Sequence, residues 1–328
     1  MSREHATEPP LIPALTGAVF LRGRNLYKAS GGVAHLPAAV ESIYPALFTG
    51  GSTLDDLARQ AGTGTGALRS AMEFTGTVAL VPFPELDQEW DLVIVDQGAT
   101  GVFVQTLDLW RSLNRQGRAL LISLQPPPFP DSALQEPPEL RQRLLTLEDL
   151  IGRGLPRSHI GYYHFLRTAL SRIRAGLLLF TFRREATFFF DVIGRRPAVI
   201  YSDFYHEQKF ALARHLFGDA RPGAAETNRL LEYLYFNIHL QFQGSTPAND
   251  LGRLQADWLA MCAARENWCW SATEVEQLER ASELTTIRFT GPSVDLDRLD
   301  RAGGGERRRQ VLFVSTMPNF HRKGLVPL

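Results

Sequence analysis

The stretch DLVIVDQGATGVFVQTLDLWRSLNRQGRALLIS, residues 91–123, decides the fold class of this chain. Two short apolar runs, DLVIV and ALLIS, enclose a segment in which Phe103, Leu107 and Trp110 follow the spacing of one helix face. A strand that is apolar along its whole length needs cover on both faces, as strands of parallel sheets have. The stretch therefore predicts a strand, a helix and a second, parallel strand joined by a right-handed crossover.

The same rhythm continues toward the C-terminus. Short apolar runs alternate with helical stretches, at 176–182 (GLLLFTF), 198–202 (AVIYS), 268–271 (WCWS), 286–291 (TIRFTG) and 310–315 (QVLFVS). This alternation is typical of doubly wound α/β proteins. We therefore predict a Rossmann-like parallel sheet.

The first part of the chain has a different pattern. Two extended segments, 18–23 and 32–38, precede compact helical segments and the apolar run 77–83. In STLDDLARQAG (52–62), Ser52 or Thr53 is a suitable N-cap, and the glycine-rich turn after it leads to a second short helix. Two helices across a tight turn, flanked by extended segments, indicate a small winged-helix-like α+β module.

Three regions follow from these patterns, at 1–88 (the winged-helix-like module), 89–303 (the Rossmann-like domain) and 304–328 (the start of a further domain). RAGGGERRR, 301–309, has the composition of a hinge. The proline-rich segment 125–140 leaves the sheet where a βα loop would emerge. Two interpretations of it stay open, the rim of a cleft or a surface excursion.

Composition excludes several classes of protein. The 328 residues carry 35 Lys and Arg against 35 Asp and Glu, so no global field attracts nucleic acid or an anionic membrane. In the segment 66–74 Arg69 is the one basic residue, and Glu73 offsets its charge, which disfavours a DNA recognition helix. The N-terminus lacks a signal core, and every apolar run is much shorter than a membrane span. We expect a soluble, cytoplasmic protein, for which peripheral membrane contact stays open.

Metal and covalent chemistry are also disfavoured. Cys262 and Cys269 have neither the spacing nor the histidine partners of a zinc site, and no disulfide is expected. The chain has no GxSxG elbow for a hydrolase, and the loop after Asp96 has neither the GxGxxG of NAD sites nor the GK[ST] of a P-loop. Glycines in that loop would still let a phosphate approach the backbone at a helix start. Contact with phosphate and an ordinary βα loop are both open interpretations.

From residue 90 onward the chain resembles retaining GT-B glycosyltransferases of the large group 1 superfamily, similar to family 4. The resemblance rests on the ordered series formed by residues 91–123, by DFYHE after the strand AVIYS, by WSATEVEQLE (270–279), by IRFTGPSVDLDRL (287–299) and by QVLFVSTMPNFHRKG (310–324). It implies an acceptor-side Rossmann-like domain followed by the beginning of a donor-binding domain. The implied donor is a nucleotide-diphosphate sugar, the acceptor is unknown, and neither a cofactor nor a metal is expected.

The resemblance also implies roles for particular residues. The leaving diphosphate would be held by Gly98, Thr100, Gly101, Arg322 and Lys323. His206 or Asp203 would orient or deprotonate the acceptor hydroxyl, or stabilise the cationic centre. The acceptor cleft would be lined by Gln125, Arg183, Arg184, Glu207 and Glu274. Structural interpretations stay open for His206, for the two arginines and for Glu274, which can equally be a hydrogen-bonded histidine and exposed helix residues.

Three departures from the family pattern bear on activity. Thr316 stands where the family often has an arginine, and Ser202 and Asp203 stand where it usually has the cleft histidine. The sequence also ends before the acidic residues that bind the donor in the family. We therefore expect a truncated glycosyltransferase that is inactive as this chain alone. The alternative is a non-catalytic peptide- or partner-binding protein on a degenerate α/β scaffold, with the N-terminal module either pairing a peptide at a strand edge or acting as a structural cap.

Overall fold

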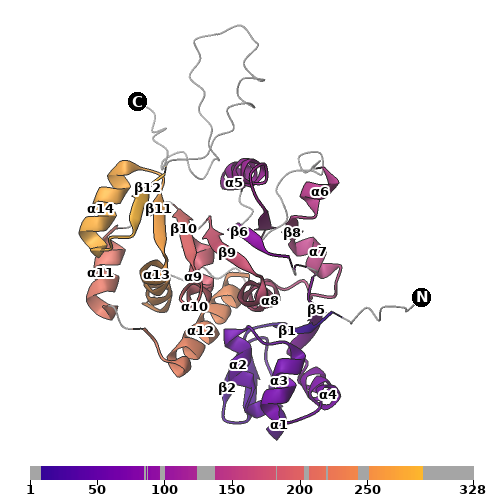
Figure 1. The fold of residues 1–328 in the computed structure, drawn as a ribbon. Helices are drawn as coiled ribbons and strands as arrows, with labels where there is room; N and C mark the ends of the chain where they lie inside the picture. Colours follow the sequence, from indigo (N-terminus) through magenta and orange to yellow (C-terminus); the bar gives the residue numbers. More distant parts are fainter. Residues whose placement is uncertain are drawn as a thin grey trace, which may run out of the picture. The chain divides into compact units, whose positions relative to one another are not determined.

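Seven parallel strands form the central sheet of the structure (Figure 1). The structure is a computed structural model that describes residues 9–84, 86, 88–96, 100–123, 137–181, 183–202, 207–218, 221–242 and 251–290. Their order across the sheet is β12-β11-β10-β9-β6-β7-β8, and every neighbouring pair is parallel. The strands are β6 (Trp90–Asp96), β7 (Ala119–Ser123), β8 (Leu144–Thr146), β9 (Ala175–Phe180), β10 (Ala198–Ser202), β11 (Glu266–Cys269) and β12 (Ile287–Phe289). Counted from β6, this is the Rossmann order 3-2-1-4-5-6 with one more strand beside the sixth.

Alternate residues of each central strand point to opposite faces of the sheet, and each face has its own core. Val93 and Val95 of β6 belong to the larger core, whereas Ile94 packs with Leu107 and Trp110 of α5 in the smaller one. The helices that follow the first sheet strand are α5 (Thr100–Leu113), α6 (Pro138–Arg141), α7 (Leu147–Ile151), α8 (His159–Arg172), α9 (Arg183–Phe188), α10 (Phe190–Ile193), α11 (Glu207–Phe217), α12 (Ala224–Phe242), α13 (Leu251–Ala263) and α14 (Ala272–Ser282).

The prediction of a parallel α/β sheet is confirmed. Each apolar run chosen from the sequence between 91 and 291 overlaps a strand of this sheet. The three-residue strand β8 was not predicted, and the short helix α6 begins within the proline-rich segment 125–140. The predicted strand at 310–315, the hinge at 301–309 and most of the proline-rich segment lie outside the described residues.

The N-terminal segments, which the structure describes over residues 9–84, form two small antiparallel sheets and four helices there. One sheet pairs β1 with β5, and the other has the order β2-β3-β4. The Thr53 side chain accepts from the Asp56 amide while the Asp56 carboxylate accepts from the Thr53 amide, so the predicted N-cap is a complete capping box. The elements are β1 (Leu11–Leu15), β2 (Val19–Arg22), β3 (Asn25–Lys28), β4 (Val33–His35), α1 (Ala38–Glu41), α2 (Tyr44–Thr49), α3 (Leu54–Ala61), α4 (Thr65–Thr75) and β5 (Val78–Pro82).

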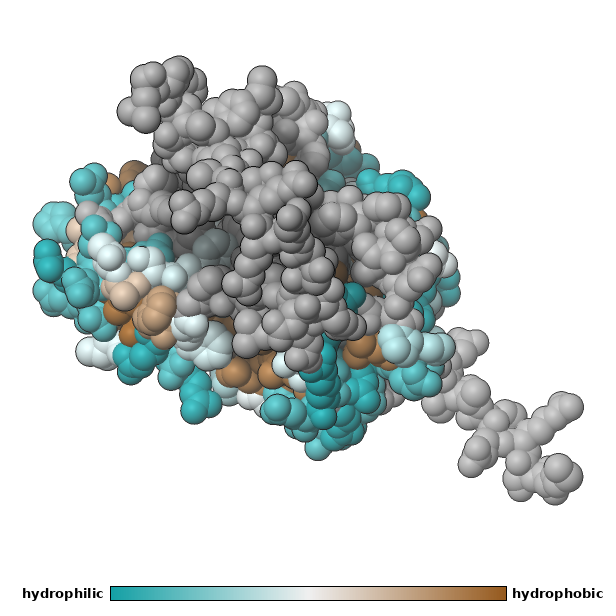
Figure 2. Space-filling model, turned by 90° about the horizontal axis from the view of Figure 1, so that it is seen from above, coloured by the Kyte–Doolittle hydropathy of each residue, from teal (hydrophilic) through white to brown (hydrophobic). Residues whose placement is uncertain are grey.

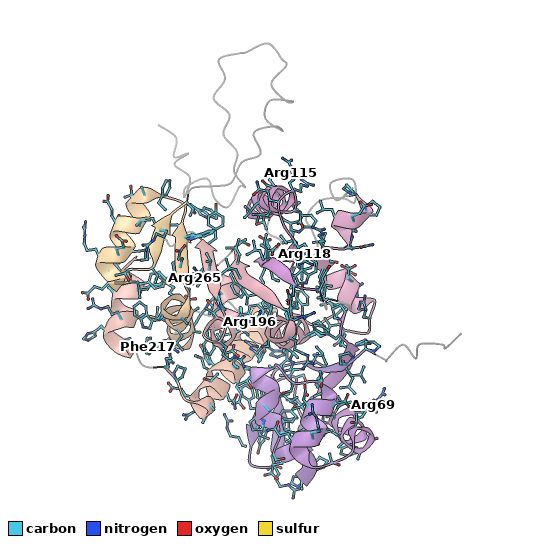
Figure 3. The ribbon with its side chains drawn as sticks, in the orientation of Figure 1. Arg69, Arg115, Arg118, Arg196, Phe217 and Arg265 are labelled. Atoms are coloured by element: carbon cyan, nitrogen blue, oxygen red, sulfur yellow. The ribbon has the colours of Figure 1, made fainter. Side chains whose placement is uncertain are left out.

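That these segments form a winged helix stays a prediction. The expected extended segments and helices are present, and β1 and β3 are additional strands. Arg69 forms an exposed ion pair with Glu73 on the outer helix α4, with Nε 3.0 Å from Oε1 (Figure 3).

Buried hydrogen bonds join the N-terminal segments to α8. The Leu15 amide donates to Nδ1 of His164 over 3.3 Å, and Nε2 of the same ring contacts the Leu47 carbonyl. The Gly51 amide donates to the Thr168 hydroxyl over 3.2 Å. Figure 1 shows these segments, in indigo, below α8 and α12. The end of β5 leads to the start of β6, so the N-terminal segments lie toward the amino edge of the sheet, the edge at which its strands begin.

Seen from above, hydrophilic side chains cover most of the visible described rim, and hydrophobic ones gather in smaller patches (Figure 2). Within the described part of the chain, every helix is too short or too polar to cross a membrane.

Candidate functional site

The strand order creates a crevice at one place on the sheet. From β6 the chain moves outward to β7 and β8, whereas from β9 it moves the other way to β10, β11 and β12. Since β6 and β9 are neighbours, the connections leaving their carboxyl ends run apart. Open α/β sheets bind their ligands at such a switch point, outside the carboxyl ends of the strands. The carboxyl edge between β6 and β9 is therefore the candidate site.

A buried carboxylate lies at this point. Asp96, the last residue of β6, is fully buried, and its Oδ2 accepts hydrogen bonds from the hydroxyls of Thr106 on α5 over 2.6 Å and of Thr181 after β9 over 2.5 Å. The Thr181 amide also donates to the Val95 carbonyl over 3.1 Å. A buried carboxylate is costly unless it is hydrogen-bonded, so these bonds are needed for Asp96 to stay there. Together the three side chains fix the ends of β6 and β9 and the first turns of α5.

The starts of four helices are brought to the same edge by the topology. Because α5, α9, α11 and α14 follow β6, β9, β10 and β11, each begins at the carboxyl end of a parallel strand. The first-turn amides of a helix lack intrahelical partners and suit an anionic group, and the fourteen-residue α5 begins at this edge. The sequence-predicted residues on these starts are Thr100 and Gly101 on α5, Arg183 and Arg184 on α9, Glu207 on α11 and Glu274 on α14.

Other predicted site residues cannot be placed in this arrangement. Gly98 and Gln125, the acid–base candidates Asp203 and His206, and the diphosphate candidates Arg322 and Lys323 lie outside the described residues. The roles given to all the predicted residues stay predictions.

Glu274 has a local electrostatic effect. It is half-buried on the first turn of α14. Burial raises the pKa of the neighbouring Cys269 thiol to about 12, and the charges of Glu274 and Glu279 add to the effect. Since the thiolate is the reactive form, Cys269 is an inert core thiol.

Sequence reasoning missed Asp96, Thr106 and Thr181 as site residues. The signal for Asp96 was available, because an acidic residue at the end of a fully apolar strand has to find partners. The two threonines could not be found from the sequence, because Thr106 meets Asp96 through the packing of α5 on β6, and Thr181 meets it through the pairing of β6 with β9.

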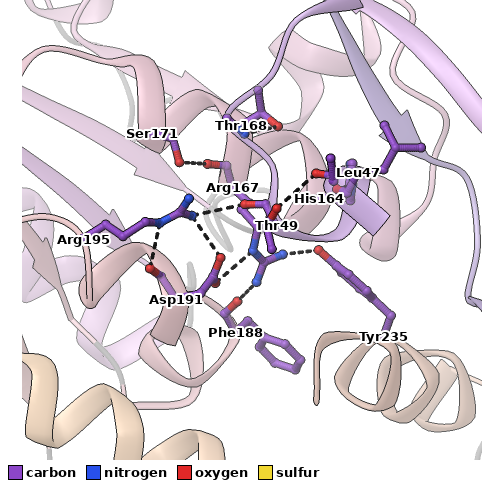
Figure 4. Close-up of polar contacts among 12 residues, drawn as sticks. Leu47, Thr49, His164, Arg167, Thr168, Ser171, Phe188, Asp191, Arg195 and Tyr235 are labelled. Carbon is purple, nitrogen blue, oxygen red and sulfur yellow. Dashed lines mark hydrogen bonds and ion pairs between the residues drawn. The ribbon is translucent and has the colours of Figure 1, made fainter. Parts of the chain in front are cut away.

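A second buried polar network lies on α8, beyond the candidate site (Figure 4). The Arg167 guanidinium is 1% exposed, and its Nε is 3.0 Å from Oδ1 of Asp191. It also donates to the Tyr235 hydroxyl and to the Phe188 carbonyl. Burial opposes its charge, but Asp191 and Tyr235 hold its pKa above the ordinary value. The side-chain contacts of Arg167 go to other helices, so they fix α8, α9, α10 and α12 together.

The described residues contain no group of three or more His, Cys, Asp or Glu side chains able to hold a metal ion. The expectation of metal-free chemistry depends also on residues outside that part of the chain, and it stays a prediction.

The fold and the switch point define an α/β protein with a Rossmann-like parallel sheet. No model of a known protein family matches the chain, and no curated protein matches it in sequence. Among solved structures, it is similar to LpCGTa in complex with UDP, with a TM-score of 0.34, 11% identity, and coverage of 66% of this chain and 57% of that one.

Two further similar structures are of UGT2 from Phytolacca americana. The complex with UDP-2fluoro-glucose and pterostilbene has a TM-score of 0.35 and 10% identity, over 62% of this chain and 53% of that one. The apo form has a TM-score of 0.33 and 9% identity, over 66% and 55%. The chain thus spans little more than half the length of these solved proteins.

Proposed function

We propose that this chain is the acceptor-side part of a GT-B glycosyltransferase, which transfers a sugar from a nucleotide-diphosphate donor to an acceptor hydroxyl. The observation that carries the proposal is the switch point, where β6 ends at Asp96, β9 ends beside it and α5 begins. It supports a ligand crevice at the carboxyl edge. The ordered resemblance of residues 90–328 supplies the reaction class.

The proposed mechanism follows from the charge that develops in sugar transfer. The leaving diphosphate gains negative charge, which amides at the start of α5, Arg322 and Lys323 would stabilise. His206 or Asp203 would take the proton of the acceptor hydroxyl as it attacks the anomeric carbon. Asp96 is a positioning residue in this mechanism, because its hydrogen bonds hold the β6 and β9 ends that frame the crevice.

The test uses the protein encoded by the full reading frame that contains this chain. It is incubated with UDP-, GDP-, ADP- and dTDP-sugars and with phenolic, saccharide and peptide acceptors, and release of the nucleoside diphosphate is measured. We expect turnover with at least one pair. We further expect H206A or D203N to lower kcat by about 10²-fold or more, the usual contribution of an acid–base group.

His215→Ala is the matched control, because His215 is exposed near the end of α11. It is expected to leave kcat and KM unchanged. The proposal is wrong if no donor releases its diphosphate, or if H206A and D203N both keep the activity of H215A.

One observation favours a second candidate function, the binding of an extended peptide at β4. Beside the antiparallel pair of β3 and β4, the Leu36 amide donates to the Arg24 carbonyl, and the Lys28 amide donates to the Gly32 carbonyl. This register turns the backbone groups of Val33 and His35 away from β3. Val33 is 59% exposed. An open edge beside an exposed apolar side chain is the feature used in strand addition. The opposite edge, β2, is covered, because the Leu21 amide donates to Glu232 of α12 over 3.1 Å.

A pair of proline variants tests this second function. Linear peptides are first selected on the chain from a displayed library. Val33→Pro removes an outward amide, so we expect the fold to persist and the selected peptides to bind about tenfold more weakly, which is about 1.4 kcal/mol. Ala34→Pro removes an amide that pairs with Leu26, and it should instead lower the unfolding midpoint. Peptides that bind V33P as tightly as the original chain would rule out the β4 edge as the binding site.

A further inference from the structure

A cavity of about 460 Å³ lies apart from the candidate site. Its walls are largely apolar, with Phe190, Trp258, Leu259 and Leu284 among the lining side chains. Its size falls in the range of sites that take small organic ligands. Trp258 is held in the wall by a hydrogen bond from its Nε1 to the Gly218 carbonyl over 2.6 Å, and Figure 3 marks Phe217, the residue before Gly218, at the end of α11.

The cavity opens at the amino edge of the sheet. Arg195 lines it from the connection that enters β10, Cys262 and Ala263 line it from the end of α13 before β11, and Leu284 lines it from the connection that enters β12. The candidate site lies at the opposite, carboxyl edge of the same sheet, between β6 and β9. The cavity is thus a separate site at the opposite end of the strands. Thr49 at the end of α2 also lines it, so the N-terminal segments contribute to its wall.

The polar part of the lining is positively charged. Asp191 is the lining carboxylate, and it is already engaged by two guanidinium groups, with Arg167 Nε 3.0 Å from Oδ1 and Arg195 Nη2 3.1 Å from Oδ2. Arg195 also donates to the Thr49 carbonyl over 3.1 Å (Figure 4). Arg221, a further lining residue, is exposed and makes no ion pair with any described side chain. Among the described lining residues, the two guanidinium groups of Arg195 and Arg221 outnumber the one carboxylate of Asp191, which leaves an excess of positive charge.

Apolar walls combined with this excess charge define the kind of occupant. We propose that the cavity binds an amphipathic organic anion, whose apolar body lies against Phe190, Leu259 and Leu284 and whose carboxylate or phosphate pairs with Arg221 and Arg195. A desolvated apolar body supplies most of the affinity, and the charged rim selects the sign of the head group. This site is independent of the proposed sugar transfer.

The experiment uses Cys262 as a reporter within the cavity wall. Cys262 is half-buried, whereas Cys269, the other cysteine, is fully buried, so peptide mass spectrometry can follow alkylation of Cys262 by iodoacetamide. The probes are naphthaleneacetate, naphthaleneethanol and naphthaleneethylammonium, which share one apolar body. We expect naphthaleneacetate to slow the alkylation saturably, and the alcohol and the ammonium ion to protect at least about tenfold more weakly, a difference of about 1.4 kcal/mol.

Arg221→Glu is the decisive variant. We expect it to weaken protection by naphthaleneacetate at least about tenfold and to leave the far-ultraviolet circular dichroism unchanged, because Arg221 is exposed. Arg153→Glu, at an exposed position after α7, makes the same change of charge away from the cavity and should leave protection intact. If R221E disturbs the fold, protection is measured on R221Q instead. Equal protection by the alcohol, or equal effects of R221E and R153E, would overturn the proposal.

Discussion

His164 shows what one buried side chain can hold together. Its ring is 1% exposed, accepts from the Leu15 amide of β1 and contacts the Leu47 carbonyl of α2. Acceptance at Nδ1 and donation at Nε2 require the neutral ring. Burial, reinforced by the charge of Arg167, lowers its pKa to about 3. The neutral state of this histidine is therefore linked to the docking of the N-terminal segments.

This linkage gives stability a defined dependence on pH. The unfolded ring titrates near pH 6.5 and the folded ring near 3, so between these values the unfolded state binds one proton more. The contribution of His164 is complete above about pH 6.5 and falls by up to about 1.4 kcal/mol per unit as the pH decreases toward 3. In urea unfolding, we expect the stability advantage of the wild type over H164Q to shrink by about 2 to 3 kcal/mol between pH 7 and 4.5.

His35 provides the matched control for that measurement, because it is exposed on β4. H35Q should change the free energy of unfolding by less than about 0.5 kcal/mol at either pH, as exposed substitutions usually do. A constant difference between wild type and H164Q across the pH range would contradict the assignment of a neutral, buried ring.

At the scale of elements, the end of α2 depends on a glycine that meets α8. Gly50 has φ 63° and ψ −168°, a conformation reached almost only by glycine, and a Cβ there would lie 2.8 Å from Cγ of Arg167. Gly62 ends α3 in the ordinary left-handed conformation, φ 64° and ψ 32°, and a Cβ there would meet nothing within 4 Å. A side chain at Gly62 would therefore cause backbone strain alone, whereas one at Gly50 would cause both backbone strain and steric overlap.

Alanine should lower the free energy of unfolding by different amounts at these two positions. We expect G62A to lower the free energy of unfolding by about 1 to 2 kcal/mol, the cost of a left-handed alanine. G50A should cost at least about 3 kcal/mol, because the conformation is rarer and Arg167 is fixed by Asp191. Urea unfolding of both variants measures the difference, and equal costs would show that α2 does not dock on α8 as described.

Elements were predictable where local chemistry is sufficient. The apolar runs identified the strands from β6 to β12 other than β8, and the Thr53 capping box is visible in STLDDL. The strands β1, β3 and β8 were missed. Each has five residues or fewer and contains a proline or polar residues, so its hydrophobic pattern is too weak to indicate a strand. They become strands because neighbouring strands satisfy their backbone groups.

For the whole molecule, the contacts between the N-terminal segments and the rest of the described chain predict how the two unfold. His164, Thr168 and Arg195 each bond a backbone group of the N-terminal segments, and Glu232 of α12 bonds the β2 edge. We therefore expect the N-terminal segments and the parallel sheet to unfold together. Urea transitions followed by tryptophan fluorescence, which reports on the sheet region, and by far-ultraviolet circular dichroism should coincide. An earlier transition confined to circular dichroism would show that the N-terminal segments unfold independently.

By itself the sequence determined the class of the fold, the positions of most strands and the edge at which the helix starts gather. These follow from hydrophobic period and from the rule that parallel strands end on one side. Only the tertiary structure decided that β6 and β9 are neighbours, that Thr106 and Thr181 share Asp96, and that a positively charged cavity lies at the other edge. The physical reason is that such contacts join residues far apart in the chain, and their energies depend on strand order and burial, which no local pattern of residues encodes.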